Sequence, residues 1–277
     1  MTWGLSMISW LKNNRFLISR RISQIGILLL FYVSVHFDWK VGGVEILEGN
    51  LSSSTFLGII PLADPFAALQ ILFTGHSLFT ETLLGAGIIL VFYALVGGRS
   101  FCSWVCPMNI VTDSSLKLRN WLKIPSAIQI SRRVRYYILA LALILSALTG
   151  VAAFEWISPI SMLQRELIFG MKLGWVAAAM IFLFDLFGQR GGWCGHLCPL
   201  GAFYSIPGKM SLIRIQFNQD PCTKCGDCHR ICPEPQVLNL RRIGEESMVS
   251  SGNCTNCGRC VTVCPEDCFQ FSFRTKK

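Results

Sequence analysis

One cysteine pattern occurs twice near the end of this 277-residue chain. Each copy has the spacing C-x2-C-x2-C-x3-C and is followed directly by proline. In such a run three closely spaced thiolates hold three irons of a [4Fe–4S] cluster, and the fourth cysteine ligates the other cluster. The copies are Cys222, Cys225, Cys228 and Cys232, then Cys254, Cys257, Cys260 and Cys264.

The exchange of the fourth cysteine gives the expected ligand sets. One set is Cys222, Cys225, Cys228 and Cys264; the other is Cys254, Cys257, Cys260 and Cys232. Gly226 and Gly258 follow the second cysteine of each run, where a small residue lets the loop wrap a cluster. A zinc site would use separated C-x2-C pairs or add histidine, and a disulfide framework would need an oxidising compartment. The pattern therefore predicts two [4Fe–4S] clusters.

Outside these two runs the shorter motif Cys-x3-Cys-Pro occurs twice more, with Cys102 and Cys106 in one copy and Cys194 and Cys198 in the other. On a helix, cysteines four residues apart share a face. Four converging thiolates could hold a third cluster or another metal, or form redox-active dithiols. They could instead be packed small side chains. The spacing leaves these alternatives open.

The composition is that of an integral membrane protein. Hydrophobic residues make up 52% of the chain, charged residues 15%, and the mean hydropathy is +0.48, which sets the chain apart from soluble domains. The formal net charge is +9. The cations lie beside apolar stretches and no aromatic-basic recognition motif occurs, so we expect no nucleic-acid partner.

Four apolar stretches are long enough to cross a bilayer, at about residues 22–37, 77–96, 136–154 and 173–187. Lysine and arginine concentrate before the first stretch and between the second and third, whereas most acids lie in the other connections. By the positive-inside rule both termini are therefore cytoplasmic. Two shorter apolar pieces, 65–73 and 159–169, are expected to be interfacial or re-entrant.

These short pieces belong to an internal repeat. DPFAALQ at Asp64–Gln70 resembles SPISMLQ at Ser158–Gln164, and each precedes a predicted helix that ends in Cys-x3-Cys-Pro. The expected fold is a membrane all-α part, with four transmembrane helices as two repeated hairpins, plus a small α+β ferredoxin-like C-terminal domain. The expected divisions are an N-terminal segment 1–21, a first hairpin 22–98, a cytoplasmic loop 99–135, a second hairpin 136–188, a linker 189–214 and the ferredoxin-like domain 215–277.

Together these features resemble the NapH/MauN-like family of membrane ferredoxin-type proteins. The resemblance rests on FCSWVCPMN at Phe101–Asn109, GWCGHLCPLGA at Gly192–Ala202 and the two ferredoxin runs. GNLSSS at Gly49–Ser54, PLADP at Pro61–Pro65 and CPEP at Cys232–Pro235 extend it along the chain.

The resemblance implies a multi-pass protein of the bacterial inner membrane that takes electrons from quinol. It implies delivery to a periplasmic iron–sulfur partner, NapG in that system, and through c-type cytochromes to nitrate reductase. One difficulty is that the predicted clusters face the cytoplasm, whereas that acceptor lies outside. The competing hypothesis is an accessory or maturation factor that supplies electrons to a periplasmic reductase without turning over quinol.

Quinol oxidation releases protons, so a quinol site needs proton acceptors near a membrane interface. His76, Asp64 and Gln70 are candidates because they lie close together in the sequence at the outer end of the second stretch. Asp64 could instead cap a short helix, and His76 could lie among lipid headgroups. Asp185 is an ionisable group within a stretch, and we expect it to pair with Arg190 or Arg99.

Overall fold

The computed structural model describes residues 2–37, 40–41, 44–45, 47–170, 173–240, 243 and 246–274. The chain forms two compact units, each assembled from separate segments. The first unit contains Met1–Ser23, Tyr93–Val105 and Tyr204–Lys277; the second contains Gln24–Phe92 and Cys106–Phe203. The predicted ferredoxin-like segment 215–277 thus lies in the first unit, together with two segments from earlier in the sequence.

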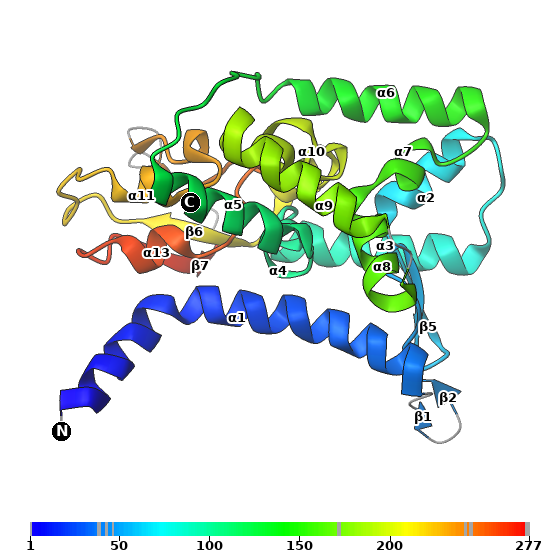
Figure 1. Cartoon of the computed structure of the whole chain (residues 1–277), viewed down its shortest axis with the longest axis horizontal. Coiled ribbons are helices and arrows are strands. Elements are labelled where there is room, and N and C mark those ends of the chain that lie inside the picture. Colours follow the sequence, from blue (N-terminus) through cyan, green and yellow to red (C-terminus); the bar gives the residue numbers. More distant parts are fainter. Residues whose placement is uncertain are drawn as a thin grey trace. The chain divides into compact units, whose positions relative to one another are not determined.

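All four predicted apolar stretches are helical (Figure 1). They form α1 (Thr2–Phe37), α3 (Thr80–Val96), α6 (Val134–Thr149) and α9 (Gly174–Leu183), which continues as the π-helical turn η1 (Phe184–Gly188). Within the described part of the chain, Asn14–Phe37 is the one segment long and apolar enough to cross a membrane, and the other three are shorter apolar helices.

Two of these helices differ in length from the expected stretches. Helix α1 begins near the chain start because no proline interrupts it, so most of the predicted N-terminal segment is helical. Helix α6 stops before residue 154 because Gly150 adopts a left-handed C-cap conformation with φ 70°. The short helix α7 (Ala153–Ile157) follows it.

The two short apolar pieces are the helices α2 (Pro65–Phe73) and α8 (Pro159–Phe169). Each begins with proline after a capping residue: the Asp64 carboxylate accepts from Phe66 N, and the Ser158 hydroxyl accepts from Ser161 N. Helix α2 packs against α6, and α8 packs against α9. Both helices are too short to cross a bilayer.

In each short helix a buried glutamine accepts a hydrogen bond from the backbone of the other repeat. Gln70 Oε1 accepts a 2.8 Å hydrogen bond from Phe154 N, just before α8. Gln164 Oε1 accepts a 3.0 Å hydrogen bond from Leu51 N, upstream of α2. Both glutamines are at most 1% exposed. These reciprocal contacts tie the two repeats together inside the second unit.

The remaining elements connect these helices. The connection after α1 contains the two-residue strands β1 (Lys40–Val41) and β2 (Val44–Glu45), then the antiparallel sheet β3 (Leu47–Gly49), β4 (Ser53–Phe56) and β5 (Ile60–Ala63). The Cys-Pro motifs lie on or beside α4 (Ser100–Trp104), α5 (Met108–Leu122), the π-helical turn η2 (Trp193–Leu197) and α10 (Pro199–Ser205), which leads to the turn η3 (Pro207–Met210).

The ferredoxin-like part is a small α+β unit with two similar halves. Strand β6 (Ile213–Phe217) pairs antiparallel with β7 (Phe269–Phe273), so the first and last strands lie side by side (Figure 1). Helices α11 (Asp227–Ile231) and α13 (Arg259–Val263) pack against each other, and the short turn η4 (Pro235–Val237) lies between them in sequence. The buried core includes Ile215, Phe217, Leu238, Val249, Val261 and Phe269. This arrangement agrees with the predicted C-terminal fold.

Candidate iron–sulfur site

The two ferredoxin runs form loops with matching backbone turns. In the first loop Lys224 and Gly226 have left-handed φ angles of 58° and 81°. In the second, Asn256 and Gly258 occupy the same motif positions with φ angles of 48° and 72°. A short helix follows each loop and carries the third cysteine of its run. The duplicated pattern therefore produces a duplicated backbone shape.

Each loop borders a cavity lined by cysteines from both runs. The first cavity encloses about 340 Å³ free of protein atoms, including some space open to solvent. The second encloses about 370 Å³ by the same measure. The cysteines lining the first are Cys222, Cys225, Cys228 and Cys264, with Cys268; those lining the second are Cys232, Cys254, Cys257 and Cys260. Each cavity thus brings together the four cysteines of one expected set, and their role as cluster ligands stays a prediction.

Burial and neighbouring thiols both act on the cysteines of the two loops. Burial raises the pKa of Cys228, and the charges of other thiols raise it further; those thiols belong to Cys225, Cys222 and Cys264. Burial also raises the pKa of Cys254, to about 11. The metal-free protein therefore holds neutral thiols at these sites, whereas bound iron stabilises thiolates. Soft thiolates lining a closed pocket are the donor set that a [4Fe–4S] cluster uses.

The ligands of one cluster bind different irons, so they stand farther apart than the ligands of a single ion. Accordingly, among the described residues no three His, Cys, Asp or Glu side chains are grouped closely enough to hold one metal ion. Cys268, the thirteenth cysteine, is buried, and its backbone N–H donates to Cys264 Sγ at 3.4 Å. Hydrogen bonds of this kind to ligand sulfurs tune a cluster.

Helix α4, which carries Cys102, is bonded to the second ferredoxin loop. The Ser103 hydroxyl donates to Thr255 O at 2.6 Å, and Trp104 Nε1 donates to Asn256 O at 3.0 Å. These acceptors lie between Cys254 and the next cysteine of the run. The part of the first Cys-Pro motif that carries Cys102 is therefore directly linked to the second loop within the first unit.

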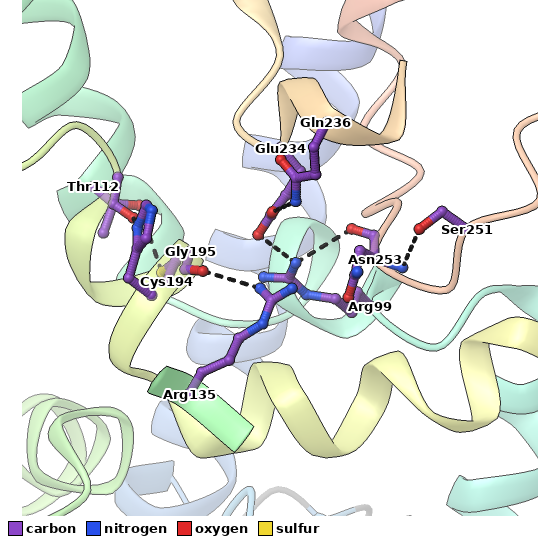
Figure 2. Close-up of polar contacts among 11 residues, drawn as sticks. Arg99, Thr112, Arg135, Cys194, Gly195, Glu234, Gln236, Ser251 and Asn253 are labelled. Carbon is purple, nitrogen blue, oxygen red and sulfur yellow. Dashed lines mark hydrogen bonds and ion pairs between the residues drawn. The ribbon is translucent and has the colours of Figure 1, made fainter. Parts of the chain in front are cut away.

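Just before α4, Arg99 makes an ion pair with a residue that is far away in the sequence (Figure 2). Arg99 Nη1 donates to Glu234 Oε1 at 2.5 Å and to Asn253 O at 3.2 Å.

The expectation that Asp185 pairs with Arg99 or Arg190 is wrong. Asp185 Oδ1 accepts from Trp193 N, and the guanidinium of Arg119 donates to the Asp185 backbone carbonyl.

Three of the four Cys-Pro cysteines, Cys106, Cys194 and Cys198, lie in the second unit, and Cys102 lies in the first. Around the later motif, Cys194 Sγ lies 4.0 Å from Thr112 Oγ1, and Arg135 Nη1 donates to Gly195 O (Figure 2). His196 is bonded to Gln189 and to the carbonyl of Gly191. The third metal or redox site on these four cysteines stays a prediction.

The candidate quinol residues lie at and after α2. Asp64 caps the helix, as one of its two predicted roles requires. Gln70 is fully buried and binds the backbone of Phe154. His76 is exposed in the connection after α2. Asp64 and Gln70 thus have structural contacts that the sequence could only suggest, and a quinol role for the three stays a prediction.

Two family models of iron–sulfur proteins match the chain. One, described as a 4Fe-4S binding domain, matches residues 78–125 and 168–218, which contain both Cys-Pro motifs. The other, described as a 4Fe-4S dicluster domain, matches residues 214–265. The chain therefore carries iron–sulfur clusters.

Curated relatives are similar over most of the chain. The methylamine utilization ferredoxin-type protein MauN of Methylorubrum extorquens is 45% identical over 98% of this chain and 93% of its own length. The ferredoxin-type protein NapH of Haemophilus influenzae is 45% identical over 85% of this chain and 79% of its own length. NapH of Escherichia coli is 42% identical over 89% and 84%. No solved structure matches the chain.

Proposed function

Because the chain belongs to the NapH/MauN family of ferredoxin-type proteins, we propose that this iron–sulfur electron-transfer protein is a membrane subunit that oxidises quinol. The observation that carries the proposal is the pair of cysteine cavities in a chain that also contains one apolar helix long enough to cross a membrane and three shorter apolar helices. Such a protein can collect electrons from a lipid-soluble donor and deliver them to another protein.

We propose two [4Fe–4S] clusters, one for each cavity. Cys222, Cys225, Cys228 and Cys264 would hold the first; Cys254, Cys257, Cys260 and Cys232 would hold the second. When bound, each cluster supplies one-electron redox chemistry. The chain itself provides the thiolates, the left-handed loop residues that turn them inward, and the apolar core that excludes water. Quinol carries two electrons, so two one-electron centres match its stoichiometry.

Exposed apolar side chains on the four helices support a multi-pass membrane location. Leu29 on α1, Phe92 on α3, Ile144 on α6 and Met180 on α9 are all at least half exposed. Soluble monomers rarely expose apolar surface on this scale, whereas lipid-facing helices require it. Together with the cation distribution, this favours four spans in the bacterial inner membrane with both termini in the cytoplasm.

The partners are proposed from the resemblance to NapH. A periplasmic iron–sulfur subunit like NapG and a membrane c-type cytochrome would carry the electrons toward periplasmic nitrate reductase. Relatives named for methylamine utilization are equally similar to this chain, so a redox system of methylamine utilization is the second candidate for the terminal acceptor. In both cases this chain is the quinol-side component and acts only with a partner.

The two protons released from each quinol need acceptors close to the quinol hydroxyls. His76, Asp64 and Gln70 remain the proposed groups. His76 has an exposed imidazole that can take a proton and pass it to water. The Asp64 carboxylate would position a hydroxyl at the start of α2, and the buried Gln70, bonded to Phe154 N, would hold the helix in place beside it.

The test is anaerobic reduction of the purified chain, with its partner, by a menaquinol or ubiquinol analogue. Quinol oxidation predicts that the cluster absorbance bleaches at about one quinol per protein chain, because each quinol gives two electrons and each cluster takes roughly one. A maturation factor predicts clusters whose redox state does not respond to quinol, together with a partner reductase that lacks cofactor when this chain is deleted. Reduction by soluble donors alone would indicate docking to a cytosolic ferredoxin.

A further inference from the structure

The two ferredoxin loops have the same backbone shape but different surroundings. In the first loop Thr223, Lys224 and Cys225 are exposed. In the second loop the corresponding residues, Thr255, Asn256 and Cys257, are buried. The two cavities therefore differ in solvent contact, and charges placed beside the second act through a medium that screens them little.

One buried ion pair lies beside the second cavity. Arg99 Nη1 and Glu234 Oε1 are 2.5 Å apart, and both side chains are 2% exposed. Glu234 lines the second cavity and follows Cys232 by two residues. Its other oxygen accepts from Gln236 Nε2 (Figure 2). Arg99 leads directly into α4 and Cys102.

Both charges lie beside cysteines of the second predicted ligand set. Glu234 lines the same cavity as Cys232 and Cys254. Arg99 Nη1 donates to the carbonyl of Asn253, the residue before Cys254, at 3.2 Å. The pair therefore places a positive charge close to one of these cysteines and a negative charge close to another.

Stability alone does not account for such a pair. Replacing a buried ion pair with well-packed apolar residues of similar volume is often neutral or stabilising, so the pair is weak evidence for a stabilising role. The reduction potential of an iron–sulfur cluster, in contrast, depends on net charge and on nearby dipoles. A positive charge stabilises the reduced form, which carries one more negative charge, and a carboxylate disfavours it.

We propose that the Arg99–Glu234 ion pair sets the reduction potential of the cluster held by Cys254, Cys257, Cys260 and Cys232, and leaves the first cluster unaffected. Arg99 and Glu234 are thus positioning residues for electron transfer, and neither is a ligand. The pair also fixes the segment before Cys102 against this cluster, because Arg99 bonds Asn253 O beside Cys254. The inference rests on the proposed pair of clusters and is independent of quinol.

The experiment is a redox titration of the full-length protein in detergent, monitored by EPR, with dithionite as the reductant. Removing one charge leaves the other uncompensated. We therefore expect Arg99→Gln to shift one of the two potentials to a more negative value. We expect Glu234→Gln to shift the same potential to a more positive value. The double variant Arg99→Gln/Glu234→Gln should return close to the original value, and the other potential should stay unchanged throughout.

A second ion pair provides a matched control next to the first cluster. Arg230 and Asp227 contact each other on α11, with side chains 77% and 36% exposed. Asp227 lines the first cavity. Because water and salt screen this pair, Arg230→Gln and Asp227→Asn should shift either potential much less than the buried variants do. Added salt should reduce these small shifts and leave the shifts from Arg99→Gln and Glu234→Gln unchanged.

Each outcome decides the inference. Potentials that stay fixed, or that move in the same direction in both single variants, overturn it. Where one single variant loses its clusters, the other still gives the answer: its shift must have the predicted sign and must appear in only one of the two potentials. A wild-type protein without iron would instead contradict the proposed function, and the titration distinguishes that result from a failed inference.

Discussion

Ser103 donates a 2.6 Å hydrogen bond to the backbone carbonyl of Thr255, so the residue after Cys102 is bonded to the residue after Cys254. One position further along each segment, Trp104 is bonded to the carbonyl of Asn256. Asn256 in turn donates to the carbonyls of Val96 and Ile213. Helix α4 therefore holds the second ferredoxin loop at two adjacent residues, Thr255 and Asn256.

The first prediction concerns Trp104. Trp104→Phe removes the donor to Asn256 O and leaves that carbonyl without this bond, which should cost about 0.5–1.5 kcal/mol. The second loop should then open more often, and iron should be lost faster to a chelator. The measurement is the rate at which cluster absorbance decays in excess chelator. Trp121→Phe is the control, because Trp121 is 76% exposed, and an equal rate in both variants would contradict the prediction.

The second prediction compares two equivalent glycines. A Cβ at Gly258 would lie 2.5 Å from Phe16 Cγ, whereas a Cβ at Gly226 would meet nothing within 4 Å. Both positions have positive φ, so both alanine variants carry backbone strain of about 1 kcal/mol or more. Gly258→Ala should cost about 1–3 kcal/mol beyond that because the Phe16 ring must move. Thermal loss of the clusters measures the difference.

Phe16→Ala tests the cause of that difference. Combined with Gly258→Ala it should recover part of the loss, since the clash is gone, and combined with Gly226→Ala it should recover none. Equal behaviour of the two double variants would show that Phe16 does not cover Gly258. Phe16 also packs against Phe271, with ring centroids 5.2 Å apart, so Phe16→Ala alone should be destabilising.

The third prediction concerns the reciprocal glutamines of the second unit. Gln70→Leu leaves the backbone N–H of Phe154 without its acceptor, and Gln164→Leu does the same to Leu51. Each should destabilise the protein by about 1–3 kcal/mol, the cost of an unpaired buried donor. Gln129→Leu is the control because Gln129 is exposed. Thermal unfolding in detergent measures the effect, and a control as damaging as either variant would refute the role of these bonds.

The fourth prediction concerns membrane topology. A reporter active only outside the cytoplasm should be active when inserted at Gly58, in the turn between β4 and β5. It should be inactive when inserted at Ser126 or fused after Phe273, because the cations around 99–135 stay inside. A reporter that is inactive at Gly58 and active at Ser126 would show the opposite orientation in the membrane. An active fusion after Phe273 would place the ferredoxin-like part outside and contradict its proposed cytoplasmic location.

Much of the candidate site follows from the sequence because the information is local. Cysteine spacing determines which thiols a tight loop can present, so the two ligand sets could be written down before the cavities were known. The apolar runs likewise predict the helices α3, α6 and α9. The caps of α2 and α8 follow from Asp64 and Ser158, each directly before proline.

The contacts that distinguish the two loops could not be predicted, because their partners are far apart in the sequence. Arg99 meets Glu234, and Trp104 meets Asn256, with no spacing rule that connects them. The wrong expectation for Asp185 has the same origin, because nearness in the sequence suggested Arg190 and the real neighbour is Arg119 on α5. One signal was Glu234 itself, an acid between Pro233 and Pro235 that lies two residues after a predicted ligand cysteine.

The most direct test of the account is the EPR spectrum and iron content of anaerobically prepared Cys232→Ala, compared with Cys254→Ala and Cys222→Ala. The wild-type chain should contain about eight irons, and each variant about four. Although Cys232 belongs to the first run, its variant should lose the same EPR signal as Cys254→Ala and keep the signal that Cys222→Ala loses. A Cys232→Ala protein that loses the signal lost by Cys222→Ala, or wild-type protein without iron, would contradict the account.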